Sequence, residues 1–177
     1  MINRCSQALV VEDEEDLDVA SWNHGWVQLQ LGKTFLLDTP EYVPNLELSL
    51  DISQIDLSEW DIQLDERCEL KPDVCLYPVS KYPRGLRKPV DILRMTDMPV
   101  LAIEILSPKQ GIYDIKQKFK AYFALGISSC WLVQPEIESV TVYSAIDSFK
   151  LFDRSHGDTE IIDTILEIHL SLEKIFG

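Results

Sequence analysis

The feature that most constrains this chain is an acidic residue inside an apolar run. Residues 99–106 read Pro-Val-Leu-Ala-Ile-Glu-Ile-Leu, and Glu104 is their one charged member. A run of this kind predicts a buried strand. A carboxylate in a core strand is costly unless it is paired, hydrogen-bonded or bound to a cation. The sequence therefore predicts that Glu104 belongs to a polar site in the core.

Two other segments offer partners for Glu104. Residues 72–77 predict a second strand that opens with Asp73, and residues 114–122 predict a helix that carries Lys118. Two carboxylates with a lysine nearby suggest a divalent-metal site for phosphodiester chemistry. Structural alternatives exist for each residue: Asp73 can cap a turn, Glu104 can pair with a core cation, and Lys118 can pair with Asp114 four residues earlier on the helix.

Magnesium accepts one or two carboxylates plus a backbone carbonyl, because it keeps several of its waters. Asp73, Glu104 and the carbonyl of Ile105 would make such a shell for Mg²⁺, with Mn²⁺ as a substitute. The ion would polarise a phosphoryl oxygen and lower the pKa of a bound water, and Lys118 would orient that water or stabilise the developing charge. The sequence has no HExxH motif, glycine-rich phosphate loop or GxSxG motif that would favour other chemistry.

Composition indicates a globular protein of one domain spanning residues 1–177. The hydrophobic content of 46% and the length of 177 residues suffice for a sizeable core. No apolar run approaches the roughly 20 residues of a membrane-spanning helix, and the N-terminus does not resemble a secretory signal. The four cysteines form no CxxC pair, which favours reduced thiols. We therefore expect a cytoplasmic protein with no membrane partner.

The charge is unevenly distributed along the chain. The net charge is −14, which argues against nucleic acid, yet residues 71–120 hold 10 basic and 5 acidic residues. The remainder holds 6 basic and 25 acidic residues. A loop between the two predicted strands concentrates basic residues, and we expect it to contact phosphates: Lys81, Arg84, Arg87 and Lys88. A solvated surface would explain the same pattern.

The periodicity of apolar residues predicts the order of the elements. We expect a helix over residues 19–37 that breaks near Gly32, a half-buried strand over 46–52, core strands over 73–77 and 100–106, and a helix over 113–125 that stops at Gly126. Strands over 130–133 and 140–143 and a docked tail over 161–176 follow. This order predicts an α/β fold in which helices flank a mixed sheet.

Several of these residues together resemble the PD-(D/E)XK nuclease superfamily, and within it a bacterial family of restriction-endonuclease-like proteins. The resemblance covers about residues 70–145, and earlier residues match only through His24 before a leucine-spaced segment. The residues that carry it are Pro72-Asp73, Glu104 to Pro108, Tyr113-Asp114, Lys118, Tyr122, Gly126-Ile127, Trp131 to Val133 and Pro135.

The resemblance implies a restriction-endonuclease-like fold that hydrolyses DNA with magnesium at Asp73, Glu104 and Lys118. Such folds commonly work as homodimers, so a second copy of the chain is among the partners that the resemblance allows. The superfamily places its lysine two residues after the second acid, where this chain has Leu106. The family shares this departure and has a lysine on the following helix, matched here by Lys118.

Two further departures favour a different class of function. The family usually has an acid where this chain has Gln134, and some related proteins use a glutamate on the first helix, where this chain offers Gln28 and Gln30. Together with Leu106 and the acidic remainder of the chain, these residues support the alternative: a catalytically inactive interaction module that retains the nuclease fold.

Overall fold

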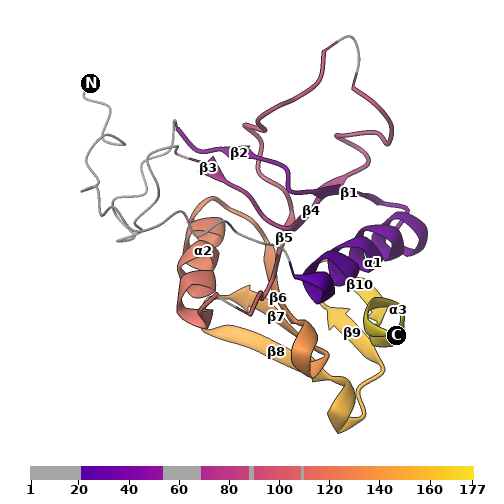
Figure 1. The fold of residues 1–177 in the computed structure, drawn as a ribbon. Coiled ribbons are helices and arrows are strands. Elements are labelled where there is room, and N and C mark those ends of the chain that lie inside the picture. Colours follow the sequence, from indigo (N-terminus) through magenta and orange to yellow (C-terminus); the bar gives the residue numbers. More distant parts are fainter. Residues whose placement is uncertain (1–20, 54–68, 88–89, 109) are drawn as a thin grey trace.

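A six-stranded mixed sheet forms the centre of the fold (Figure 1). The computed structural model describes residues 21–53, 69–87, 90–108 and 110–177. The parallel pair in this sheet is β5–β6, and its other neighbouring strands are antiparallel. In spatial order the strands are β1 (Tyr42–Leu46), β4 (Val74–Pro78), β5 (Leu101–Ile105), β6 (Ser129–Gln134), β7 (Ser139–Ala145) and β8 (Ser148–Asp153).

Helices cover both faces of the sheet, which confirms the expected α/β class. On one face lie α1 (Trp22–Asp38), α3 (Leu172–Phe176) and the hairpin of β9 (Glu160–Asp163) and β10 (Ile168–Ser171), and on the other lies α2 (Ile112–Ala124) (Figure 1). A short pair, β2 (Leu50–Asp51) and β3 (Glu69–Leu70), and two 3-10 turns, η3 (Pro135–Ile137) and η4 (Arg154–His156), complete the described elements.

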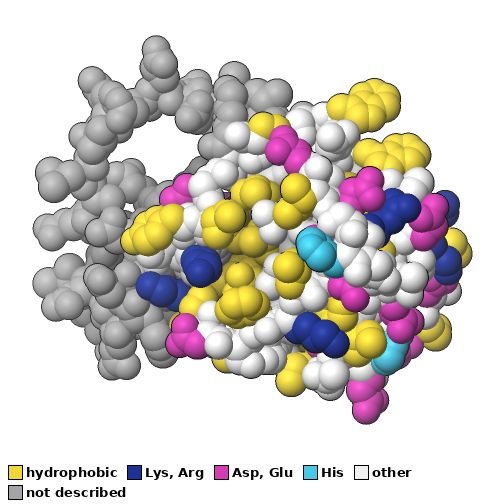
Figure 2. Space-filling model, turned by 90° about the horizontal axis from the view of Figure 1, so that it is seen from below, with side chains coloured by type: hydrophobic (Ala, Val, Ile, Leu, Met, Phe, Trp, Pro, Cys, Tyr) yellow, Lys and Arg dark blue, Asp and Glu magenta, His cyan; other side chains and the backbone are white. Residues whose placement is uncertain are grey.

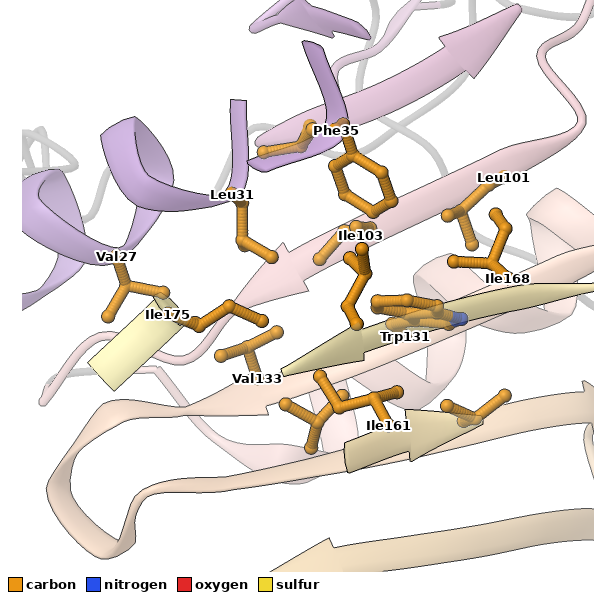
Figure 3. Close-up of a cluster of buried hydrophobic side chains, with 14 of the residues drawn as sticks. Val27, Leu31, Phe35, Leu101, Ile103, Trp131, Val133, Ile161, Ile168 and Ile175 are labelled. Carbon is orange, nitrogen blue, oxygen red and sulfur yellow. The ribbon is translucent and has the colours of Figure 1, made fainter. Parts of the chain in front are cut away.

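Alternation along β5 divides the core between these two faces. Leu101 and Ile103 point toward α1, where they pack with Phe35 and Trp131 (Figure 3). Ile105 belongs to the same buried cluster. Ala102 points toward α2, and Glu104 follows it two residues later on the same side. Because successive strand side chains alternate faces, the acid lies among the apolar side chains that anchor α2.

The first helix is continuous at the point where the sequence predicts a break. Ser21 caps its N-terminus by accepting from the amide of His24, and the helix continues through Gly32 to Asp38. The expected break at Gly32 is wrong because this residue serves close packing: a Cβ there would lie 3.3 Å from a methyl of Leu46.

The predicted strand over residues 46–52 is also wrong in part. Glu47 has a φ of 51°, which is incompatible with a strand, so Leu46 ends β1 and Leu50 begins β2. The alternation of leucines here reflects two short strands with a bend between them. By contrast, the predictions for α2, β4, β5, β6 and β7 are confirmed to within a few residues, and Gly126 with a φ of 85° follows the end of α2.

The C-terminal segment docks on the core as predicted. Its buried side chains pack with α1 and the sheet, and they are Ile161, Ile168, Leu170, Leu172 and Ile175. Asp163 in the same segment is fully buried and accepts hydrogen bonds from the Ser129 hydroxyl at 2.6 Å and the Trp131 indole at 2.8 Å. These contacts fasten the β9–β10 hairpin to β6.

The described surface carries mixed charge. From below, hydrophobic side chains gather near the middle of the described face, and Lys and Arg are dispersed in small groups among Asp and Glu (Figure 2). Among the described residues, no helix has the length and apolar character needed to cross a membrane.

Candidate active site

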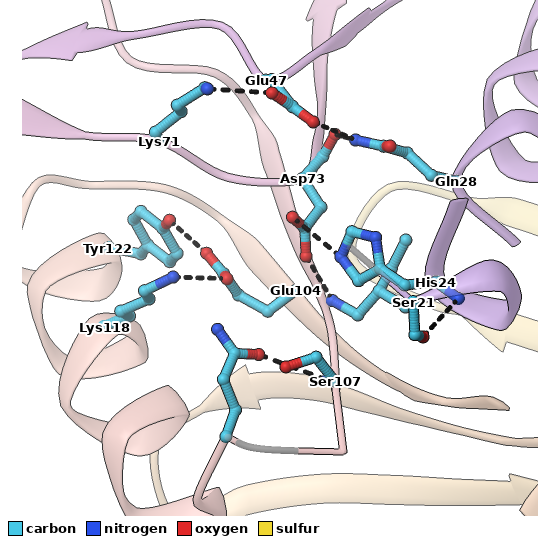
Figure 4. Close-up of polar contacts among 12 residues, drawn as sticks. Ser21, His24, Gln28, Glu47, Lys71, Asp73, Glu104, Ser107, Lys118 and Tyr122 are labelled. Carbon is cyan, nitrogen blue, oxygen red and sulfur yellow. Dashed lines mark hydrogen bonds and ion pairs between the residues drawn. The ribbon is translucent and has the colours of Figure 1, made fainter. Parts of the chain in front are cut away.

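The register of β4 and β5 brings the two predicted carboxylates together. Val74 pairs with Ile103 in this antiparallel pair. Asp73 precedes β4 and Glu104 lies near the end of β5, so the two carboxylates lie at the same end of the paired strands. The side chains of α1 approach this point from one face of the sheet, and those of α2 from the other (Figure 4). Residues from four elements therefore meet here.

Glu104 is held by two side chains of α2. Its side chain is 1% exposed, and it accepts from the Lys118 ammonium at 2.8 Å and from the Tyr122 hydroxyl at 2.5 Å. Burial raises the pKa of Glu104 to about 7; Lys118 opposes this rise, and Asp73 adds to it. Burial and the neighbouring Glu104 also raise the pKa of Tyr122 well above its usual range, so its hydroxyl stays a donor.

Asp73 is held by α1 and β5. One carboxylate oxygen accepts from the amide of Ile105 at 2.6 Å, and the other lies 3.2 Å from Nε2 of His24. Gln28, one turn further along α1, donates to the carbonyl of Asp73 at 3.0 Å. The spacing of four residues places His24 and Gln28 on the same face of the helix, so α1 fixes both the side chain and the backbone of Asp73.

A further ion pair lies next to this carboxylate pair. Lys71 contacts Glu47 at 2.9 Å, and Gln28 also approaches the Glu47 carboxylate at 3.4 Å. The hydrogen bond from Lys71 is the largest cause that lowers the pKa of Glu47. Glu47 therefore stays charged and holds Gln28, which in turn positions the chain at Asp73.

The structure thus brings Asp73, Glu104 and Lys118 together as the sequence predicts. Lys118 pairs with Glu104 of β5, on the face of the sheet that α2 covers, rather than with Asp114 on its own helix. Ile105 contributes its amide to Asp73, and the predicted role of its carbonyl as a metal ligand stays a prediction. The contact of His24 with Asp73 was not predicted, because a lone histidine on a helix gives no signal for a carboxylate 49 residues later.

The basic loop lies elsewhere. It joins the end of β4 to the start of β5, and these are the ends opposite Asp73 and Glu104. Arg84 donates to the carbonyls of Leu36, Thr39 and Tyr42 at 2.8–3.0 Å, at the end of α1. Lys81 pairs with Asp97 at 2.7 Å, and the Arg87 guanidinium lies over the Tyr82 ring. Lys88 lies outside the described residues.

The donor set of the site fits a hard divalent cation. Within the described residues, no group of three or more His, Cys, Asp or Glu has the geometry to hold a metal, so the relevant donors are the two carboxylates. Each of their four oxygens has one partner among the described residues. Oxygen donors of this number suit Mg²⁺, which retains water. The mutual repulsion that helps to raise the pKa of Glu104 would be relieved by a cation between the two.

Comparison with known proteins agrees with this arrangement. The family model Uma2, described as "Putative restriction endonuclease", matches residues 17–173. The chain belongs to the Uma2 family. The match includes His24, Asp73, Glu104 and Lys118, so all residues of the candidate site fall within the part of the chain that defines the family.

A solved structure shows the fold of this Uma2 protein independently. It is described as a putative nuclease belonging to DUF820 from Anabaena variabilis ATCC 29413. The TM-score is 0.64 at 20% identity, with 88% of this chain and 81% of the other covered. No curated protein matches the chain. The chain therefore has the fold and the family membership of nuclease-like proteins.

Proposed function

We propose that this protein is a magnesium-dependent endonuclease that hydrolyses phosphodiester bonds of DNA. The observation that carries the proposal is the buried Glu104, which lies beside Asp73 and bonds Lys118 and Tyr122 of α2. A buried acid with a perturbed pKa and a specific charged partner is a candidate functional residue. The family description and the solved relative name nucleases, which supports the same class of reaction.

The proposed site residues have two roles: some would bind the metal ion, and Lys118 would stabilise the charge that develops during the reaction. Asp73, Glu104 and the carbonyl of Ile105 would hold Mg²⁺ or Mn²⁺, which supplies a polarised phosphoryl oxygen and a bound water of lowered pKa. Lys118 is about one-third exposed, so its ammonium can reach both Glu104 and solvent. It would orient the attacking water and stabilise negative charge that develops on the phosphoryl oxygens.

Two further residues act through the carboxylates. His24 holds Asp73 from α1, and Tyr122 holds Glu104 from α2. Both are positioning residues because they contact the proposed ligands and not the substrate. Their bonds fix the separation of the two carboxylates, and separation of this kind decides whether both can face one ion.

Phosphate contacts are better placed on α2 than on the basic loop. Lys116 and Lys120 are exposed on α2 and form no ion pair with another described residue. Because residues two apart on a helix point to opposite sides, both lysines lie on the outer side of α2, away from Lys118. The cations of the loop are engaged at the far end of the sheet. We infer that DNA that reaches the site would also extend over the outer side of α2, with its backbone on these two lysines.

The test measures ion binding and cleavage separately. Mg²⁺ or Mn²⁺ should raise the melting temperature of the wild type and support cleavage of plasmid DNA. Glu104→Gln should abolish both effects, because a ligand that binds only the folded state stabilises it by mass action. Lys118→Ala should keep most of the thermal shift and reduce cleavage by about 100-fold or more, the range for loss of one charge-stabilising donor.

Lys150→Ala is the matched control, because Lys150 lies on β8 over the Phe152 ring and should change neither readout. A metal response that is equal in Glu104→Gln and wild type would remove Glu104 from the site. Metal binding without cleavage in the wild type would favour the inactive interaction module.

A further inference from the structure

Helix α1 is apolar on two opposite faces, and one of them is exposed. The inner face packs on the sheet through Val27, Leu31 and Phe35. The outer face carries large exposed side chains: Trp22 (86% exposed), Trp26 (43%), Leu29 (58%), Leu36 (48%) and Leu37 (68%). Contiguous exposed apolar side chains of this size are typical of interaction sites. The outer face therefore has the character of an interface.

The spacing of this outer face is that of a helix-pairing seam. Trp22, Trp26, Leu29, Lys33 and Leu36 follow one another at intervals of 4, 3, 4 and 3 residues. These are the a and d positions of a heptad, in which Lys33 is the single polar a residue. On the same heptad the inner residues Val27, Leu31 and Phe35 occupy b, f and c. One face of α1 thus packs on the core of its own chain, and the opposite face has the spacing that suits pairing with a second helix.

The charge on this face favours a second copy of the chain. Each chain carries a net charge of −14, so two copies repel one another unless they meet where carboxylates are absent. The helix has two residues with formal charge, Lys33 and Asp38, and Asp38 pairs with Lys174 at 2.6 Å. A nucleic-acid strand is less suited to this face, because one lysine over four helical turns offers little for phosphates.

We propose that α1 pairs with α1 of a second copy of this chain to form a homodimer, with the two helices antiparallel. In an antiparallel pair, a positions face d positions of the partner. Trp26 then packs on the second copy's Leu29, and Lys33 lies over the second copy's Trp22. The cation thereby meets an aromatic face, whereas parallel pairing would place the two Lys33 ammonium groups against each other.

Sedimentation of the full chain tests the proposal. The wild type should sediment as a species of twice the 20.3 kDa chain mass, and Leu29→Glu should weaken association by about 100-fold or more, since each dimer contains the change twice. Leu93→Glu is the matched control: Leu93 is 85% exposed on the loop between β4 and β5 and should leave the dimer intact. A monomeric wild type at all concentrations, or equal loss in both variants, would overturn the proposal.

A cross-linking experiment tests the orientation. Trp26→Cys and Leu29→Cys are made in a chain whose Cys5 and Cys68 are serine; Cys75 and Cys130 are buried. Mixing the two variants under oxidation should give the mixed disulfide in clear excess over either variant alone. Efficient disulfide formation by Trp26→Cys alone would indicate parallel helices and overturn the antiparallel arrangement. Stacking of DNA bases on Trp22 by a monomer would assign the face to nucleic acid instead.

Discussion

The energetic cost of burying Glu104 connects stability with function at the scale of single residues. An ionised carboxylate with one ammonium and one hydroxyl partner is less stable inside the protein than in water, which is why its pKa rises to about 7. Because the buried carboxylate is unfavourable when it is ionised alone, binding of a cation next to it would stabilise the folded protein strongly. The same residue therefore weakens the ion-free protein and would strengthen the ion-bound one.

This linkage predicts a pH dependence of stability without metal. The native state binds the Glu104 proton more tightly than the unfolded chain, whose pKa is about 4.5. Stability therefore falls as pH rises from about 4.5 to about 7 and is level above that. At about 1.4 kcal/mol per pKa unit the loss is on the order of 3 kcal/mol. Denaturant unfolding of wild type and Glu104→Gln across this range should show a difference that grows with pH.

Added Mg²⁺ should oppose the loss in the wild type alone, because ion binding requires the deprotonated carboxylate. Parallel stability curves for wild type and Glu104→Gln, with no divergence between pH 4.5 and 7, would show that Glu104 does not titrate abnormally.

How far sequence predicts this site depends on the residue. Glu104 can be identified as a site residue from the sequence alone, because a single acid in an apolar strand needs a partner. Lys118 is harder, since Asp114 offers it a local ion pair of similar spacing, and burial of Glu104 decides against that pair. His24 gives no signal, because its contact with Asp73 depends on how α1 lies on the sheet. Contacts between distant segments follow from packing, which periodicity does not encode.

At the scale of elements, α1 joins the candidate site to the basic loop. Its first turns hold Asp73 through His24 and Gln28, and its last carbonyls accept from Arg84. Unsatisfied carbonyls at a helix C-terminus carry partial negative charge, which a guanidinium neutralises. The sequence predicts that Arg84 contacts phosphate. In the structure its guanidinium instead donates hydrogen bonds to carbonyls at the C-terminal end of α1 and just after it.

Arg84→Ala should therefore destabilise the fold. The side chain contacts three carbonyls, and because the residue is exposed we expect a loss of about 1–2 kcal/mol. Arg87→Ala should cost less, since that side chain makes one long hydrogen bond to Pro83 and lies on Tyr82. Urea unfolding of the two variants tests the ranking, and an equal or reversed order would contradict it.

Strand predictions failed where the backbone bends for reasons outside the apolar pattern. The leucines at 46, 48 and 50 alternate as in one strand, but the left-handed conformation of Glu47 divides them between β1 and β2. The same residue uses its side chain to pair with Lys71 and to approach Gln28. Glu47 thus contacts residues next to the candidate site and has a left-handed backbone conformation that strands and helices disfavour.

At the scale of the whole molecule, the proposed binding of DNA requires a local positive surface on an acidic protein. On the face that Figure 2 shows, the described Lys and Arg side chains are dispersed among acids. The net charge repels DNA at long range, so specific phosphate contacts have to supply the affinity. We assign such contacts to Lys116 and Lys120, which are exposed on the outer side of α2.

Salt dependence of DNA binding distinguishes α2 from the loop. With metal removed to prevent cleavage, Lys116→Ala with Lys120→Ala should reduce the slope of log affinity against log salt by about 2, one for each phosphate contact. Arg84→Ala with Arg87→Ala should leave the slope unchanged. If the loop variant alone flattens the slope, DNA binds at the far end of the sheet and the assignment to α2 is wrong.

The position of α1 against the C-terminal segment also determines when the protein can fold during synthesis. Its inner face packs with Leu172 and Ile175 of α3, which follow it by more than 130 residues. Translation proceeds at about 5–20 residues per second, so α1 waits on the order of 10 s for its packing partner. Until then the part of its inner face that packs on α3 stays open to water, even after the strands of the sheet have been synthesised. We expect the nascent chain to bind chaperones that recognise exposed hydrophobic segments during this interval.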